Sequence, residues 1–240
     1  MIFTLKPGTL YLIPTILADE TAPQVLPPQI AVHVAALSYF LVENARTARR
    51  FIKSVAPTQV IEDLRISVID KDSTEAQIQA ALKPVLAGQD AGVISEAGCP
   101  GIADPGAELA RAAHTLGVRV VPLVGPSSLL LALMASGMNG QSFTFHGYLP
   151  IDRSRRAAAI KQLEKLALAQ HQTQLFIETP YRNMQLLEDL LSQLHSATRL
   201  CIAASLTAPN EYVRTNTIAG WKKAGLPEIH KQPAVFLVGR

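Results

Sequence analysis

The chain has 240 residues, of which 48% are hydrophobic and 17% are charged, and its net charge is +3 at pH 7. This length is long for one domain and suits two, and the composition excludes a disordered chain. The small positive charge permits an anionic partner without requiring one. Cys99 and Cys201 are distant in sequence, which argues against a disulfide framework or a zinc site. Because the N-terminal residues lack signal-peptide features, we expect a cytoplasmic protein.

In chain order, the first part of the sequence alternates strands with helices. Short apolar runs predict strands at residues 9–13, 39–42, 91–95, 118–124 and 143–146. Helical spacing of apolar residues predicts helices at residues 46–55, 74–86, 105–116 and 129–136. Asp72 or Ser73 is the expected N-cap of the helix at 74–86. The uncharged stretch 120–137 is interrupted by Gly125 and Pro126, so we expect a strand, a turn and a buried helix rather than a membrane span.

The composition changes near residue 147, and a basic helical run follows at residues 152–169. Beyond it we expect a strand at 175–178, a helix at 183–195 and strands at 200–204 and 234–238. The alternation predicts an α/β protein whose mainly parallel or mixed sheets are covered by helices on both faces. We therefore expect two α/β domains, residues 1–147 and residues 148–240.

The loop that follows residue 95 is the strongest functional signal, because ligands of α/β proteins lie at the carboxyl ends of strands. Gly98, Gly101 and Gly106 permit a left-handed backbone and close approach of a ligand. Their spacing matches neither the dinucleotide-binding fingerprint nor the P-loop. A tight strand-to-helix turn without a ligand is the alternative.

Residues 125–128 repeat the arrangement of a strand, a glycine turn and a helix start. Ser127 and Ser128 would present free N–H groups and hydroxyls to a polar ligand, or would simply cap the helix. A serine nucleophile is disfavoured because the second glycine of the G-x-S-x-G elbow is absent. The six histidines are scattered without a pair at i, i+4, so we expect no metal.

Two further segments place an acidic side chain four or fewer residues before an arginine, directly after a predicted strand. Glu43 and Arg46 could orient a substrate hydroxyl and its phosphates, or merely open a helix with a solvated face. Glu178 could accept hydrogen bonds from an amine or a ribose, or pair with Arg182 on one helical turn.

Seven segments in this order resemble the tetrapyrrole methylase superfamily, the class III S-adenosylmethionine-dependent methyltransferases. Within it the sequence is most similar to the ribosomal RNA small subunit methyltransferase I branch, which methylates a cytidine 2′-oxygen of small-subunit rRNA. The segments are residues 8–15 (GTLYLIPT), 43–46 (ENAR), 94–106 (ISEAGCPGIADPG), 121–128 (VPLVGPSS), 145–150 (FHGYLP), 177–182 (IETPYR) and 206–211 (LTAPNE).

The resemblance implies two α/β domains, a homodimer and S-adenosylmethionine bound in a cleft between the domains. By motif position it assigns donor contacts to Pro14, Ser95, Ala97, Gly98, Cys99, Ile102, Ser127, Ser128, Glu178, Leu206 and Ala234. Glu43 and Arg46 are the catalytic candidates on the acceptor side. An RNA acceptor would gain phosphate contacts from Arg153, Arg155, Arg156 and Lys161.

The sequence also departs from the family pattern, as expected of a divergent member without the small C-terminal extension. Pro14 is not followed by the usual Gly-Asn, the D-A-G-T-P motif has Glu96 and Cys99, and the E-D-T-R motif has Asn44 and Ala45. Two alternatives to rRNA methylation therefore stay open. One is a methyltransferase of a small, tetrapyrrole-like molecule, and the other is a donor-binding protein without catalysis.

Overall fold

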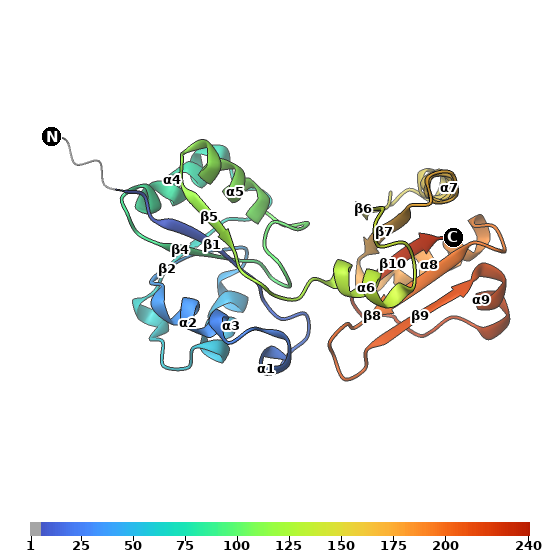
Figure 1. Ribbon diagram of the computed structural model, residues 1–240, viewed down its shortest axis with the longest axis horizontal. Helices are drawn as coiled ribbons and strands as arrows, with labels where there is room; N and C mark the ends of the chain where they lie inside the picture. Colours follow the sequence, from blue (N-terminus) through green and yellow to red (C-terminus); the bar gives the residue numbers. More distant parts are fainter. Residues whose placement is uncertain (1–5) are drawn as a thin grey trace. The chain divides into compact units, whose positions relative to one another are not determined.

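The computed structural model describes residues 6–240, which form two compact units, one ending at Ser127 and the other spanning Ser128–Arg240 (Figure 1). Each unit has its own five-stranded sheet and its own hydrophobic packing. The first sheet is wholly parallel and the second is mixed, which confirms the predicted α/β class. No helix among residues 6–240 is long and apolar enough to cross a membrane.

The first unit alternates strands with crossover helices, as parallel pairing requires. Its sheet has the order β3-β2-β4-β1-β5. The strands are β1 (Thr9–Ile13), β2 (Tyr39–Val42), β3 (Arg65–Val68), β4 (Ala91–Ile94) and β5 (Arg119–Pro122). The helices are α1 (Ala22–Val25), α2 (Gln29–Ala36), α3 (Ala45–Val55), α4 (Glu75–Leu86) and α5 (Gly106–Thr115).

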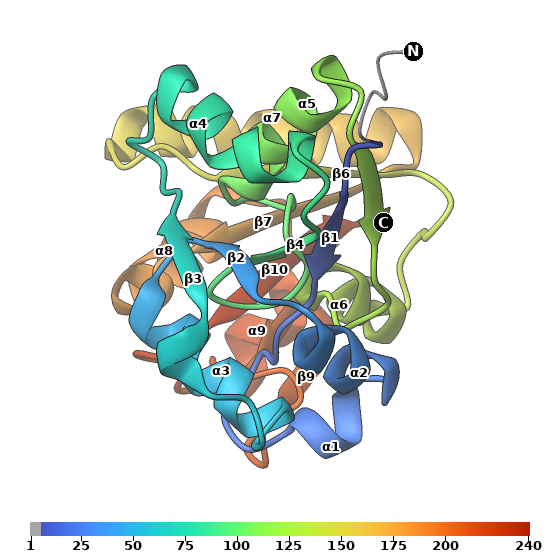
Figure 2. The same ribbon diagram turned by 90° about the vertical axis from the view of Figure 1, so that its left-hand side faces the viewer.

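Helices cover both faces of this sheet, as Figure 2 shows. Phe40 of β2 packs with the buried residues of α2 and α3 on one face. Leu41, its neighbour in the strand, packs with those of α4 and α5 on the other face. Because successive side chains of a strand point to opposite faces, β2 and β4 are buried along their whole length and read as continuous apolar runs.

The loops after β1 and β4 leave the sheet toward opposite faces. The chain passes from β1 through α1 and α2 on one face, and from β4 through α5 on the other. Because β1 and β4 are neighbours in the sheet, their loops diverge at its carboxyl edge. Open parallel sheets bind ligands at such a topological switch point.

The second unit has the sheet order β6-β7-β10-β8-β9, in which only β6 and β7 run parallel among the described pairs. Its strands are β6 (Phe143–Tyr148), β7 (Thr173–Glu178), β8 (Arg199–Ala204), β9 (Tyr212–Thr217) and β10 (Ala234–Gly239). Its helices are α6 (Ser128–Ser136), α7 (Arg153–Gln170), α8 (Asn183–Gln193) and α9 (Ile218–Ala224), with a 3₁₀ turn, η2, at Pro180–Arg182.

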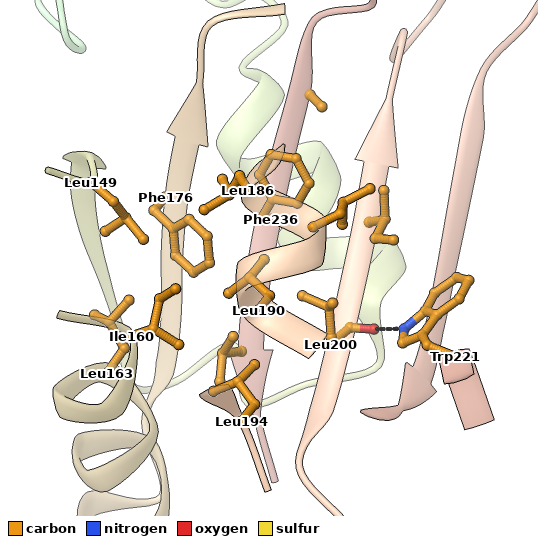
Figure 3. Packing of buried hydrophobic residues seen from close by; sticks show 14 of the residues in the cluster. Leu149, Ile160, Leu163, Phe176, Leu186, Leu190, Leu194, Leu200, Trp221 and Phe236 are labelled. Atoms are coloured by element: carbon orange, nitrogen blue, oxygen red, sulfur yellow. Dashed lines mark hydrogen bonds between the residues drawn. The ribbon is translucent and has the colours of Figure 1, made fainter. Parts of the chain in front are cut away.

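The core of the second unit lies between the sheet and helices α7, α8 and α9 (Figure 3). Phe176 of β7 and Phe236 of β10 stack with ring centroids 5.9 Å apart. Trp221 of α9 is 1% exposed, and its indole Nε1 donates to the carbonyl of Leu200 over 2.9 Å. The apolar helix α6 contacts β8, β9 and β10. Ala132 and Leu133 of α6 are buried, whereas Leu130 and Met134 are 52% and 78% exposed.

A buried ion pair joins α7 to α8. Arg156 is 3% exposed, and its Nε donates to Asp189 Oδ2 over 2.7 Å. The terminal nitrogen Nη1 of Arg156 donates to the carbonyl of Ile151 over 2.7 Å. Arg156 is therefore a structural residue, and its predicted role in binding RNA phosphates is wrong. The prediction failed because an arginine in a basic helical run has the same spacing whether it faces solvent or a buried carboxylate.

The structure departs from the sequence-based expectations at four other places. The boundary between the units lies at Ser127 and Ser128, earlier than the expected boundary at 147–148, because β6 pairs with β7 and α6 packs on the second sheet. The N-cap of α4 is Thr74, which forms a capping box with Gln77. Helices α1 and α2 follow β1 in a stretch where the sequence predicts no helix. Strands β3 and β9 and helix α9 were likewise not predicted from the sequence.

Candidate functional site

The loop that follows β4 lies at the carboxyl edge of the first sheet, beside the loop that follows β1. The N–H of Thr15 donates to the carbonyl of Gly98 over 2.8 Å, which joins the two loops. Gly98 has a φ of +73°. A Cβ atom there would lie 3.3 Å from Leu17 Cδ2 and 3.4 Å from the carbonyl oxygen of Pro126. The backbone conformation and the close neighbours at this position therefore favour glycine.

Two buried hydroxyl groups at this edge have no hydrogen-bond partner within residues 6–240. Thr15 is 2% exposed and Ser95 is 7% exposed, and both Thr15 Oγ1 and Ser95 Oγ are unpartnered. Leaving such an atom unpaired costs roughly 1–3 kcal/mol, so its presence calls for a reason. Hydroxyls with free hydrogen-bonding capacity beside a glycine-containing loop suit a small polar ligand.

Most of the predicted donor contacts of the first unit gather around this edge. A Cβ atom on Gly125 would lie 2.3 Å from the ring of Pro14, so the loops after β1 and β5 touch. Cys99 Sγ lies 3.3 Å from the carbonyl oxygen of Pro126. Burial raises the pKa of the Cys99 thiol, and the charge of Asp104 raises it further, so the thiol is neutral at physiological pH. Cys99 thus acts as a small neutral side chain.

The far end of the loop is held by Asp104. Its Oδ1 accepts hydrogen bonds from the N–H groups of Gly101, over 2.8 Å, and of Gly106, over 2.6 Å. These bonds close the turn and satisfy a free donor at the start of α5. Ile102, at the tip of the turn, is 53% exposed. Asp104 therefore shapes the loop.

Glu43 lies beside this loop, in an acidic groove of about 720 Å³ within the first unit. The groove is lined by charged side chains that follow β2, β3 and β4, namely Glu43, Asp70, Lys71, Asp72, Glu96, Asp104 and Glu108. The N–H of Glu96 donates to Glu43 Oε2 over 3.2 Å. Burial raises the pKa of Glu43, and the neighbouring carboxylates raise it further, against the lowering effect of the Glu96 hydrogen bond.

Arg46 does not pair with Glu43. The ion pairs found among residues 6–240 include neither side chain. Arg46 is exposed on the first turn of α3, whose N-cap is Asn44. Asn44 Oδ1 accepts the N–H of Arg46 over 2.9 Å. Both interpretations of this segment therefore keep support, because Arg46 opens a capped helix and leaves its guanidinium free to meet an anion.

The raised pKa of Glu43 predicts how stability depends on pH. The folded protein holds the Glu43 proton more tightly than the unfolded chain does, so ionisation of Glu43 lowers the free energy of unfolding as the pH rises above 4.5 and through the folded pKa. Glu43→Gln removes this loss. We expect the variant to be more stable than the parent at pH 7.5 and the gap to close below pH 4.5.

Urea titrations at pH 4 and pH 7.5 measure the effect. The same exchange at Glu62, an exposed carboxylate of the same unit, is the control. A stability difference between Glu43→Gln and its parent that stays constant with pH would show that the pKa of Glu43 is not raised.

Three predicted donor contacts of the second unit, Glu178, Leu206 and Ala234, lie together at one edge of its sheet. Ala234 of β10 pairs with Glu178 at the end of β7 and with Ala204 of β8. Leu206 follows β8, between Ser205 and Thr207, whose φ values are +48° and +69°. Left-handed conformations at two non-glycine residues are costly and cluster at functional sites. Ser127 ends the first unit and Ser128 begins α6.

Glu178 is buried and forms an ion pair with Arg182. Its Oε1 accepts hydrogen bonds from Arg182 Nε over 2.9 Å and from a terminal nitrogen of Arg182 over 2.6 Å. The N–H of Thr179 donates to the same oxygen over 2.7 Å. The predicted pairing of Glu178 with Arg182 is therefore confirmed, and Glu178 Oε1 is already occupied.

Within residues 6–240 no group of three or more His, Cys, Asp or Glu side chains is arranged to hold a metal ion. Thr15 is the residue of the first-unit edge that the sequence analysis missed. A hydroxyl directly after a buried strand is a weak signal, and only the structure shows that it has no partner.

Comparison with known proteins identifies relatives. The sequence profile described as Tetrapyrrole (Corrin/Porphyrin) Methylases matches residues 16–220. The chain is 34% identical to Ribosomal RNA small subunit methyltransferase I of Vibrio cholerae over 149 residues, which cover 62% of this chain and 50% of the relative. For the protein of the same name from Mycobacterium bovis the identity is 31% over 206 residues, covering 83% and 68%. The chain spans about half the length of several curated relatives that it matches.

The fold has known counterparts as well. Uroporphyrin-III C-methyl transferase from Thermus thermophilus complexed with S-adenyl homocysteine matches with a TM-score of 0.59 and 15% identity, over 97% of this chain and 98% of that chain. This match shows a common fold. The family profile extends over most of the chain and includes strands of both sheets. The chain therefore belongs to the tetrapyrrole (corrin/porphyrin) methylase family.

Proposed function

We propose that this protein is an S-adenosylmethionine-dependent methyltransferase that acts on small-subunit ribosomal RNA. The observation that carries the donor assignment is the edge formed by Thr15, Ser95 and Gly98. It combines two unpartnered buried hydroxyls with a glycine in the left-handed conformation, at the switch point of a parallel sheet. S-adenosylmethionine supplies an activated methyl group when it is bound.

The residues of the first unit would hold the donor by shape and hydrogen bonds. Backbone groups around Gly98, together with the hydroxyls of Thr15 and Ser95, suit a ligand with an amino-acid moiety and a ribose. Pro14, Ala97, Cys99 and Ile102 would add neutral surface. The assignments of Ser127, Ser128, Glu178, Leu206 and Ala234 rest on the resemblance and stay predictions.

Glu43 is our candidate for the base on the acceptor side. A ribose hydroxyl must lose a proton as its oxygen is methylated, and a carboxylate whose pKa is raised accepts a proton more readily. The exposed guanidinium of Arg46 would contact a phosphate near that ribose. Alignment of the two reactants and exclusion of water supply most of the remaining rate acceleration.

The charge distribution supports an RNA acceptor. Residues 128–240 contain twelve Lys and Arg against seven Asp and Glu, whereas residues 1–127 contain ten against twelve. The net positive charge is therefore concentrated in the second unit. A basic unit beside an acidic one is typical of proteins that bind a polyanion with one part of the chain. The names of the curated relatives point to the same substrate.

Two measurements test the proposal. Calorimetric titration with S-adenosylhomocysteine should show saturable binding at one site per chain. Transfer of a labelled methyl group from S-adenosylmethionine to 30S subunits should then yield an rRNA position that resists alkaline cleavage, because a methylated 2′-oxygen cannot attack the adjacent phosphate.

Each alternative has its own signature in these measurements. If the protein binds neither S-adenosylmethionine nor S-adenosylhomocysteine, the methyltransferase assignment is wrong. Transfer of the methyl group to a uroporphyrinogen but not to 30S subunits would show that the substrate is a tetrapyrrole and not rRNA. Binding of S-adenosylhomocysteine without methyl transfer to either substrate would indicate a binding protein without catalysis. A homodimer, implied by the resemblance, and a cytoplasmic location, expected from the N-terminal residues, stay predictions.

A further inference from the structure

An exposed aromatic side chain stands at the edge of the second sheet where β7 ends. Tyr181, in the 3₁₀ turn η2, is 72% exposed. Its ring meets the ring of His230, which lies in the loop before β10, with centroids 6.4 Å apart in an edge-on arrangement. Arg182 and Lys231 follow these two residues in sequence. We call these four residues, Tyr181, Arg182, His230 and Lys231, the Tyr181 surface.

The backbone under the Tyr181 surface is held tightly. Asn183, which is fully buried, donates from its side-chain nitrogen to the carbonyl of Gln232 over 2.6 Å and to that of Ile229 over 3.4 Å. The N–H of Lys231 donates to the carbonyl of Pro180 over 3.0 Å. These bonds tie the loop before β10 to η2. The surface is therefore fixed in shape before any ligand arrives, which reduces the entropy lost on binding.

The Tyr181 surface contains two cations, Lys231 and Arg182, and Lys231 has a costly backbone conformation. Lys231 has a φ of +62°, a left-handed conformation that a lysine adopts only when its surroundings impose it. Lys231 is exposed, and no ion pair found among residues 6–240 includes it. Arg182 is fixed by Glu178 and keeps 30% of its side chain exposed. The surface thus joins an oriented guanidinium and a free ammonium to an aromatic pair.

Further positive charge lies at the same edge of the sheet. Strands β6 and β7 are parallel, with Tyr148 paired to Ile177, so both end at this edge. Helix α7 begins just after β6, and its first turns carry Arg153, 82% exposed, and the exposed Arg155. The nearby carboxylates make contacts of their own: Glu178 binds Arg182, and Asp189 binds Arg156 and lies 3.6 Å from Arg153. The exposed Glu228 accepts the N–H of His230 over 3.0 Å and is an acidic side chain next to the surface. The edge therefore presents aromatic rings among cations.

We propose that the Tyr181 surface binds an unpaired nucleotide of the RNA substrate, with its base against the Tyr181 ring and its phosphate near Lys231. Proteins recognise single-stranded RNA by stacking bases on aromatic side chains and arginine planes, with basic side chains along the backbone. The proposal deepens the proposed function and rests on it, because it takes the methyl acceptor to be RNA.

Fluorescence anisotropy with a labelled, unstructured twelve-nucleotide RNA tests the stacking contact. Tyr181→Ala should weaken binding about tenfold or more, which corresponds to the usual effect of losing one base–aromatic stack. Tyr181→Phe retains the ring and should bind within about twofold of the parent. Phe143→Ala is the matched control, because Phe143 is 42% exposed in the same unit, at the opposite end of β6. It should leave RNA affinity unchanged.

The salt dependence of binding tests the phosphate contact. Lys231→Asn removes the charge with a side chain that tolerates the left-handed conformation. It should reduce the slope of log K against log salt concentration by about 0.7, the value for one phosphate contact on a single strand. Lys165→Gln, an exposed lysine two-thirds of the way along α7, should leave the slope unchanged.

Titration of every variant with S-adenosylhomocysteine separates this inference from the proposed function. The expected result is an unchanged donor affinity with a lowered RNA affinity in Tyr181→Ala. Equal RNA affinity of Tyr181→Ala and the parent would overturn the inference while the donor titration still reports on the methyltransferase assignment. A loss of donor affinity in Tyr181→Ala, with RNA affinity intact, would also overturn it and assign the surface to the donor's adenine.

Discussion

Replacement of Gly98 by alanine is expected to weaken binding of S-adenosylhomocysteine at least tenfold. Gly98 has a φ of +73°, where an alanine costs on the order of 1–2 kcal/mol. The new methyl group would also press on Leu17 Cδ2 at 3.3 Å and on the Pro126 carbonyl oxygen at 3.4 Å. Relief of either contact would move the loop, which is joined to Thr15 by the hydrogen bond from the Thr15 N–H to the carbonyl of Gly98.

Gly117→Ala separates the backbone strain from the effect on the site. Gly117 has a φ of +71°, and a Cβ atom there would meet nothing within 4 Å. Gly98→Ala and Gly117→Ala therefore have a similar backbone strain energy, and both should lower the melting temperature by a similar amount. Only Gly98→Ala should lose donor affinity in calorimetric titration. Equal donor affinities of the two variants would remove the loop after β4 from the donor site.

Replacement of Asp189 by alanine is expected to destabilise the second unit by about 3–5 kcal/mol. The change leaves Arg156, which is 3% exposed, without the carboxylate that accepts its Nε hydrogen bond over 2.7 Å. A buried charge without a partner keeps the full cost of its desolvation. The double variant Arg156→Met with Asp189→Leu removes both charges and should recover most of the lost stability.

Urea unfolding followed by tryptophan fluorescence measures this effect in the right unit. Trp221 is the single tryptophan of the sequence and is buried in the core of the second unit. Its emission therefore reports on that unit and not on the first. If Asp189→Ala and the double variant were equally unstable, the loss would come from packing rather than from the unpaired arginine.

Strongly apolar elements could be predicted from the sequence, and weakly apolar ones could not. Strands β2 and β4 are buried on both faces and appear as continuous apolar runs. β3 forms the edge of its sheet, has no fully buried residue and was missed. β9 is likewise an edge strand with a mostly polar sequence, YVRTNT. β5 and β6 are edge strands too and were predicted, so the polar composition of β9, rather than its edge position, hid it.

The candidate site was predictable to a similar degree. The glycine-containing loop could be found because its residues have a local conformational meaning, which holds wherever the loop lies. Thr15 could not be found, because its importance depends on the absence of a partner in the folded protein. The burial of Arg156 was hidden for the same reason, since Asp189 lies 33 residues away in sequence. Pairing across such distances is decided by tertiary packing.

The position of β10 in its sheet affects how the second unit can form during synthesis. β10 follows the other strands of its sheet in sequence, yet it pairs with β7 on one side and β8 on the other. Until β10 leaves the ribosome, β7 and β8 each expose an unpaired edge, and Phe176 lacks the ring on which it stacks. Unpaired edges promote aggregation, so the second unit is exposed to this hazard until its last strand is made, whereas the strands of the first unit are all made before residue 128.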